Sequence, residues 1–241
     1  MPTETSPPEN AAPVTSLSDP RAISLLTTEH WSLLTARSLA YNEAFVRGGM
    51  FLTFLSMSFV ALALLSQGMS FGSQFLTVAA IVLAFDLVVG LTTYGRMNGA
   101  NVDDLRALHG MARIRHGYTQ IAPIVAPYFT AATHDDVDAV LTAYGHLPEK
   151  LSGQILYGVS TSSGMIGLIV SMVGGVLAGV LALLFGLSGS LPVWIGVGGA
   201  ILVFAGLLAF TTGSVPRAQA RLPVLFPTPG TEAAADGDRS G

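Results

Sequence analysis

Residues 75–94 form an apolar stretch that is long enough to cross a bilayer and is interrupted by a single acid, Asp86. Three further apolar blocks of similar length occupy residues 50–66, 164–186 and 191–211. Only 11% of the 241 residues are charged, whereas soluble domains carry about 25%, and the mean hydropathy is +0.59. The sequence therefore predicts an all-α, polytopic membrane protein with two transmembrane helical hairpins.

The regions outside these blocks are expected to form two tails, an amphipathic helix and a helical insert. Residues 1–20, and the tail at the other end, are rich in Pro and polar residues and lack an apolar core, which predicts disorder. The expected organisation begins with a disordered N-terminal tail (1–20), a cytoplasmic amphipathic helix (21–49) and transmembrane hairpin 1 (50–95). A helical cytoplasmic insert (96–163), transmembrane hairpin 2 (164–212) and a disordered C-terminal tail (213–241) follow.

The positions of the basic residues predict the orientation in the membrane. All 11 Lys and Arg residues lie before the first block, between the second and third, or after the fourth. The two short turns, residues 67–74 and 188–190, contain none. Basic loops stay in the cytoplasm, so both termini and the insert are expected there. Arginine-rich composition is typical of a GC-rich bacterial genome, which favours the bacterial inner membrane. The net charge of −4 gives no general attraction to nucleic acid.

Two apolar stripes predict how the helices outside the bilayer meet. A helix over residues 28–47, capped by Thr27 or Thr28, would present Trp31, Leu34, Ser38, Tyr41 and Phe45 on one face. Asn101 is expected to cap a second helix, which ends near Pro123 and presents Met111, Ile114, Tyr118, Ile121 and Val125. We expect the two stripes to pack together. Thr133 is expected to cap a third helix, with Asp135 and Asp136 in its first turn and Gly145 at its end.

Asp86 is the only formal charge within the four apolar blocks. Acids at this depth usually face protein or water, and counting from the cytoplasmic ends brings Ser58 and Ser171 to a similar depth. With no cation there, burial favours the neutral carboxyl. Two interpretations stay open: a neutral acid that specifies helix packing, or a proton or cation site on a transport path.

The third apolar block carries small residues at every fourth position, namely Ser163, Gly167, Ser171, Gly175 and Gly179. Small residues at this spacing let helix backbones approach closely. The row predicts packing inside the chain, and a homo-oligomer interface is the alternative.

Basic and imidazole side chains share one face of the insert: Arg106, His109, Arg113 and His116. This face could meet anionic lipid headgroups or an acidic ligand, or it could pair with Asp135, Asp136 and Asp138. The acids beside His134 are explained by the start of a helix, and His109 and His116 are seven positions apart, which is not a zinc-type spacing. We predict no metal site, no cofactor and no catalytic residue, because no hydrolase, zinc or nucleotide motif occurs.

One stretch comprises Leu25–Leu34 with Arg37–Leu39 and Asn42–Arg47, and a second comprises Arg113–Tyr118 with Ile121–Pro123, Pro127–Phe129, His134–Asp136 and Tyr144–Gly145. Both stretches resemble an uncharacterised family of actinobacterial four-pass membrane proteins. The resemblance implies a bacterial inner-membrane protein and supplies no activity. It draws attention to polar residues just below the membrane, among them Glu29, His30 and Arg37, which could equally be a packed helix face.

The expected function is a non-enzymatic membrane protein that acts through assembly or interaction, with the lipid bilayer and other protein copies as partners. The alternative is an oligomeric channel or transporter that uses Asp86. A membrane-embedded enzyme would need a polar cavity around His30, Arg37 and His116.

Overall fold

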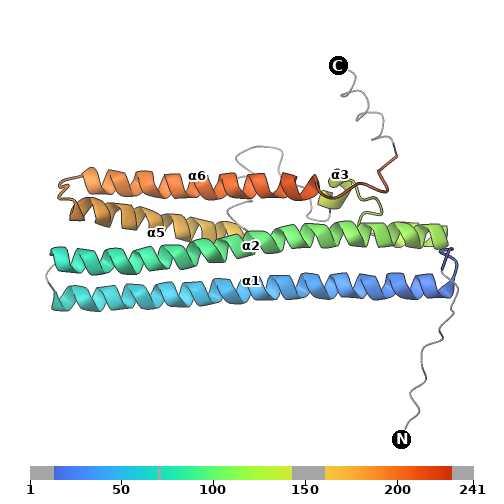
Figure 1. The fold of residues 1–241 in the computed structure, drawn as a ribbon, viewed down its shortest axis with the longest axis horizontal. Coiled ribbons are helices and arrows are strands. Elements are labelled where there is room, and N and C mark those ends of the chain that lie inside the picture. Colours follow the sequence, from blue (N-terminus) through green and yellow to red (C-terminus); the bar gives the residue numbers. More distant parts are fainter. Residues whose placement is uncertain (1–13, 70–71, 143–160, 230–241) are drawn as a thin grey trace, which may run out of the picture. The chain divides into compact units, whose positions relative to one another are not determined.

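The computed structural model describes residues 14–69, 72–142 and 161–229, and these residues are helical or irregular, without strands. The elements are α1 (Pro20–Gly68), α2 (Ser73–Ile121), the 3₁₀ helix η1 (Pro123–Tyr128), α3 (Val137–Leu141), α5 (Ser162–Leu184) and α6 (Leu191–Gln219) (Figure 1). Four of them, α1, α2, α5 and α6, are long and apolar enough to cross a membrane. The predicted all-α class is confirmed.

The chain divides into two compact units. Unit 1 contains residues 14–36, 107–142 and 224–229 of the described chain, and unit 2 contains residues 37–69, 72–106 and 161–223. Both α1 and α2 contribute residues to each unit. Unit 2 therefore contains all four predicted membrane spans, and unit 1 contains none of them.

The first helix begins earlier than predicted and does not stop at the glycine pair. The Asp19 carboxylate accepts the backbone N–H of Arg21 at 2.9 Å, and Pro20 occupies the first helical position. An acid followed by Pro is a strong start signal, so neither Thr27 nor Thr28 is the cap. The helix continues through Gly48 and Gly49 into the first apolar block, and the predicted boundary at residue 49 is not a helix boundary.

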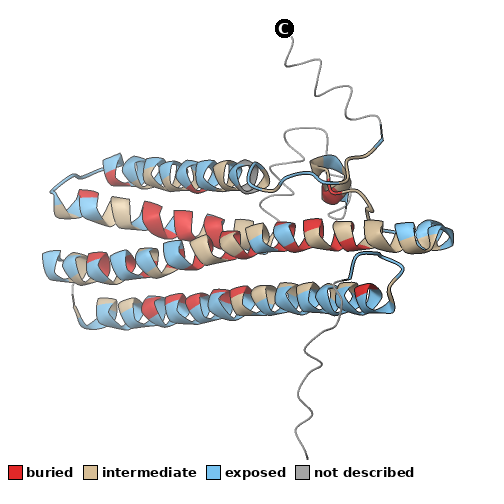
Figure 2. Cartoon of the chain, turned by 45° about the vertical axis from the view of Figure 1, so that its right-hand side comes forward, coloured by how far each residue is buried: buried red, intermediate tan, exposed pale blue. Residues whose placement is uncertain are grey.

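The buried face of α1 is not the predicted stripe. Trp31 is 62% exposed, and Leu34 and Phe45 are also exposed. In unit 1, Leu33 and Leu26 instead face the glycines Gly110 and Gly117 of α2, where an added Cβ would lie 2.8 and 3.4 Å from the leucine methyl carbons. In unit 2, α1 buries residues 44, 51 and 55, and Figure 2 shows buried turns along this helix in red. The prediction followed the largest side chains, whereas packing selected the row that fits the small residues of α2.

Helix α2 also runs without the predicted break. Asn101 lies inside it, and its side-chain amide donates to Ser163 Oγ at 3.3 Å instead of capping. The helix ends at Ile121, just before Pro123, as predicted. The short helix α3 is capped by Asp136, which accepts Ala139 N–H, and not by Thr133. Gly145 lies outside the described residues.

The C-terminal region is more ordered than predicted. Helix α6 extends beyond residue 213 to Gln219, and residues 224–228 are held by side-chain and backbone hydrogen bonds. The prediction of disorder over residues 213–241 is therefore wrong as far as residue 229. Composition favoured disorder there, but hydrogen bonds to the distant Asp135 and Asp136 fix the segment.

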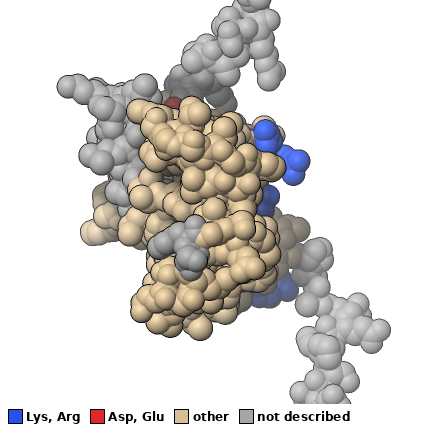
Figure 3. Space-filling model, turned by 90° about the vertical axis from the view of Figure 1, so that its left-hand side faces the viewer, with Lys and Arg blue, Asp and Glu red and all other residues tan. Residues whose placement is uncertain are grey.

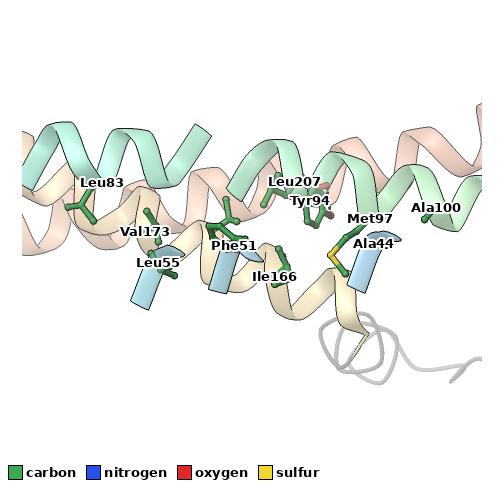
Figure 4. Packing of buried hydrophobic residues seen from close by; sticks show 11 residues of the cluster. Ala44, Phe51, Leu55, Leu83, Tyr94, Met97, Ala100, Ile166, Val173 and Leu207 are labelled. Atoms are coloured by element: carbon green, nitrogen blue, oxygen red, sulfur yellow. Dashed lines mark hydrogen bonds between the residues drawn. The ribbon is translucent and has the colours of Figure 1, made fainter. Parts of the chain in front are cut away.

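The core of unit 2 lies between α1, α2, α5 and α6. Figure 4 shows its apolar side chains directed toward one another from these helices. The buried members are Ala44, Phe51, Leu55, Leu83, Tyr94, Met97, Ala100, Ile166, Val170, Val173 and Leu207. The turn from α5 to α6 uses Gly186 with φ +81°, a left-handed conformation that favours glycine after a helix end.

Candidate functional site

Unit 1 contains a fully buried carboxylate, Asp135, that binds the backbone of residues 225 and 226. Phe226 N–H donates to Asp135 Oδ1 at 2.7 Å, and Leu225 N–H donates to Oδ2 at 3.0 Å. Arg113 Nε donates to Oδ2 at 2.7 Å. The backbone N–H of Asp135 donates in return to the carbonyl of Phe226 at 3.1 Å. This arrangement binds the backbone at the bend of residues 225 and 226 through two N–H donors and one carbonyl acceptor.

The neighbouring carboxylate, Asp136, extends the same contact by two residues. Its Oδ1 accepts the backbone N–H of Thr228 at 2.9 Å and the Thr228 hydroxyl at 2.6 Å. Its Oδ2 accepts Ala139 N–H at 3.2 Å, which caps α3. One side chain therefore joins the start of α3 to the C-terminal segment. We call Asp135, Asp136, Arg113 and His116 the clasp, and residues 224–229 the C-terminal segment.

An aromatic contact completes the clasp. The ring of Phe226 stacks on His116 with centroids 4.2 Å apart and planes 21° apart. His134 meets His116 edge-on at 5.8 Å. Offset aromatic stacking contributes about 1 kcal/mol beyond area burial. The clasp thus combines backbone recognition at residues 225, 226 and 228 with one aromatic position.

Both clasp carboxylates are held ionised. Burial opposes the charge of Asp135, but the N–H groups of Leu225 and Phe226, together with Arg113, outweigh burial and lower its pKa. Burial likewise opposes the charge of Asp136, and hydrogen bonds from Thr228 and Ala139 lower its pKa. Both groups are therefore negative at neutral pH, which strengthens the hydrogen bonds they accept.

His109 lies in the interior of unit 1 and is only 2% exposed. Neither ring nitrogen has a hydrogen-bond partner within the described part of the chain. Burial lowers the pKa of His109, and the nearby backbone and carboxylate of Asp135 act in the opposite direction. This histidine is therefore neutral at pH 7, and it does not belong to a basic surface.

The predicted basic face does not act as a single surface. Arg106 is exposed in unit 2, where it pairs with Asp103 at 2.9 Å. In unit 1, Arg113 pairs with Asp135, as one interpretation of this face expected, and His116 contacts Phe226.

The polar residues near the start of α1 separate in the same way. Glu29 is exposed, and His30 is half-buried. Arg37, in unit 2, donates to the buried Asp104. Burial, followed by the charge of Asp104, raises the pKa of Tyr41 beside this pair to about 12.

In unit 2 the predicted intramembrane group forms in part. Ser58 donates its hydroxyl to Asp86 Oδ1 at 3.0 Å, and Asp86 is fully buried. The other oxygen, Oδ2, has no hydrogen-bond partner among the described residues. Ser171, in the third span, is also buried, but its hydroxyl donates to the carbonyl of Gly167 at 2.7 Å. The structure therefore joins Ser58 to Asp86 and gives Ser171 a different partner.

The small-residue row packs within unit 2. A Cβ on Gly175 would lie 2.6 Å from the Gly196 carbonyl, and one on Gly179 would lie 3.2 Å from the Pro192 carbonyl, both on α6. A Cβ on Gly167 would lie 2.8 Å from the ring of Tyr94. The row lets α5 approach α6 and α2 closely, which is the packing interpretation of the sequence.

The main site that the sequence analysis missed is the C-terminal half of the clasp. Leu225, Phe226 and Thr228 lie about 90 positions from the carboxylates that bind them. The available signal was the spacing of Pro223, Pro227 and Pro229, because Pro is common where a chain turns. The N–H groups of Leu225 and Phe226 lie between these prolines, at a bend where both reach one carboxylate.

Comparison of the chain with protein-family models, with curated proteins and with solved structures gives no match. The resemblance to an actinobacterial family therefore stays a prediction.

Proposed function

We propose that this chain is a four-pass protein of the bacterial inner membrane that acts through protein interactions made by unit 1, and not through catalysis. In this proposal both termini and unit 1 lie in the cytoplasm. The clasp supports it most directly, because a buried, ionised Asp135 accepts the consecutive backbone N–H groups of Leu225 and Phe226 at a bend of the C-terminal segment. Such main-chain hydrogen bonds are a general mode of peptide recognition.

The distribution of charge supports the proposed topology. Figure 3 faces the end of unit 2 where α1 turns into α2 and α5 turns into α6, and the described surface nearest the viewer is almost free of charged groups. No Lys or Arg occurs in either turn. An uncharged end is suited to the outer side of the membrane, since Lys and Arg are retained in the cytoplasm.

Quantitative cross-linking in native membranes tests the proposal. The Asp135→Asn variant should lose most of the cross-linked proteins, at least fivefold by mass spectrometry, because the clasp loses its charge. The matched control is Asp138→Asn, since Asp138 is exposed and adjacent in sequence. Identical cross-linked sets in the wild type and the Asp135→Asn variant would contradict the proposal.

A transport function is the second candidate, and one observation favours it. Asp86 is fully buried among the spans, and its Oδ2 has no described hydrogen-bond partner, so a proton or cation could be bound there. An oligomer would be needed to enclose a pore around four-helix subunits. The test is proton or cation flux in proteoliposomes. Flux that Asp86→Asn abolishes supports a transport function, and the absence of flux in the wild-type protein contradicts it.

A further inference from the structure

We propose that the clasp is a binding site for a segment of a partner protein that bends as residues 225 and 226 do and carries an aromatic residue followed two positions later by Thr, as in Phe-Pro-Thr. The chain's own C-terminal segment is then a built-in competitor that occupies the site until the partner displaces it. This inference rests on the proposed function and names the chemistry of its partner.

Backbone recognition makes the site transferable from one segment to another. Residues 225, 226 and 228 are bound through their N–H groups, and the carbonyl of Phe226 accepts from Asp135 N–H. None of these four groups depends on the identity of a side chain. A segment from another protein can supply all four if its backbone follows the same bend.

Two side chains of the segment define its sequence preference. Phe226 stacks on His116, and the Thr228 hydroxyl donates to Asp136 at 2.6 Å. Val224 and Leu225 are instead 46% and 55% exposed, so the clasp places little restriction on these positions. The exposure of two apolar side chains also means that the segment is not fixed by a hydrophobic core.

The clasp is held by contacts that do not involve the segment. Arg113 holds Asp135, and the cap at Ala139 holds Asp136. Departure of the segment would leave the buried Asp135 carboxylate without its amide donors, which is unfavourable. Exchange for a second segment with the same bend avoids that cost, so the site favours replacement of its occupant over an empty state.

The test uses the full-length protein in lipid nanodiscs and a defined probe. The probe is the blocked hexapeptide Val-Leu-Phe-Pro-Thr-Pro with a photoreactive residue in place of Leu, a position that is exposed in the structure. The protein carries Phe226→Ala and Thr228→Val, which weaken its own segment. We expect at least tenfold more labelling of this variant than of the wild type, located at residues 132–136.

Three controls establish specificity. Addition of Asp135→Asn to the weakened variant should abolish labelling, whereas addition of Asp138→Asn should leave it unchanged. A probe with Ala in place of Phe and Val in place of Thr should label at background level. Equal labelling by both probes would overturn the sequence preference.

Hydrogen exchange of residues 222–229 in the same variant makes a negative result decisive. If the C-terminal segment exchanges freely and the probe still does not label, the peptide site is refuted, although unit 1 could act through another surface. If the segment remains protected, Phe226 and Thr228 do not carry recognition, and the inference is also refuted. A photoreactive residue at position 225 that links two differently tagged copies would identify a second copy as the occupant and overturn a separate partner.

Discussion

Different kinds of interaction stabilise the two units of this protein. Unit 2 packs apolar side chains and glycines, with Gly175 against the backbone of α6 and Phe51 and Val170 against Gly90. Unit 1 holds its C-terminal segment through two ionised carboxylates and one arginine. Close packing suits a region in lipid, where there is no hydrophobic drive between helices. The two units therefore differ in their main contacts: apolar close packing in unit 2 and charge-assisted hydrogen bonds in unit 1.

Among the variants that test this comparison, Asp135→Asn should cause the largest loss of stability. The substitution leaves Arg113 without its charged partner and turns an amide toward two backbone N–H groups. Breaking a buried ion pair costs about 3 kcal/mol. Chemical denaturation of the protein in nanodiscs should show this loss, while the exposed Asp138→Asn changes little. Equal stabilities of the two variants would contradict the central position of Asp135 in unit 1.

Gly175→Ala should have the next largest effect, and it acts on unit 2. The new Cβ would lie 2.6 Å from the Gly196 carbonyl, a backbone atom that cannot move aside without separating α5 from α6. Overpacking of this kind costs about 2 kcal/mol. Gly206→Ala is the control, because nothing lies within 4 Å of its added Cβ. Thermal unfolding in detergent measures both, and similar melting temperatures would exclude close α5–α6 packing.

His109 should make the stability of unit 1 depend on pH. Because burial lowers its pKa, the folded state binds a proton less well than the unfolded chain, whose histidine titrates at about 6.5. The contribution of His109 to the free energy of unfolding is therefore at its full value above about pH 6.5, and the free energy falls by about 1 kcal/mol toward pH 5.5. His109→Leu should remove this dependence. The clasp carboxylates, whose pKa values are lowered, lose their contribution only below about pH 4. An unchanged pH profile in His109→Leu would contradict the buried, neutral state.

The smallest effect should come from Ser58→Ala. The substitution removes the hydroxyl that donates to Asp86 at 3.0 Å. Hydrogen bonds between membrane helices contribute about 0.6 kcal/mol on average. Ser171→Ala is the comparison, because that hydroxyl bonds the carbonyl of its own helix. Urea or detergent titration should rank Ser58→Ala as the more destabilising of the two, and the reverse order would mean that the Ser58–Asp86 bond is not formed in the membrane.

Much of unit 2 could be predicted from the sequence because its determinants are local. Apolar length defined the four helices, spacing by four defined the Gly167–Gly179 row, and counting residues from the helix ends paired Ser58 with Asp86. Ser171 lies at a similar predicted depth, yet it bonds to its own helix, because depth along an axis does not specify the direction of a side chain.

Unit 1 could not be predicted in the same way. The exposed Trp31 and the row that contains Leu33 and faces α2 differ by a rotation of the helix, and only the surface of α2 decides that rotation. The acids at 135 and 136 were interpreted as helix-start charges, whereas their main partners lie near residue 226, in a stretch whose composition indicated disorder. Contacts over such separation leave no periodic pattern in either segment.

The most direct test of the central claim is hydrogen exchange at the Leu225 and Phe226 amides in lipid nanodiscs. The account predicts slow exchange of both amides in the wild type and in Asp138→Asn, and at least tenfold faster exchange in Asp135→Asn. Fast exchange of both amides in the wild-type protein would contradict the claim that Asp135 binds the backbone of the C-terminal segment.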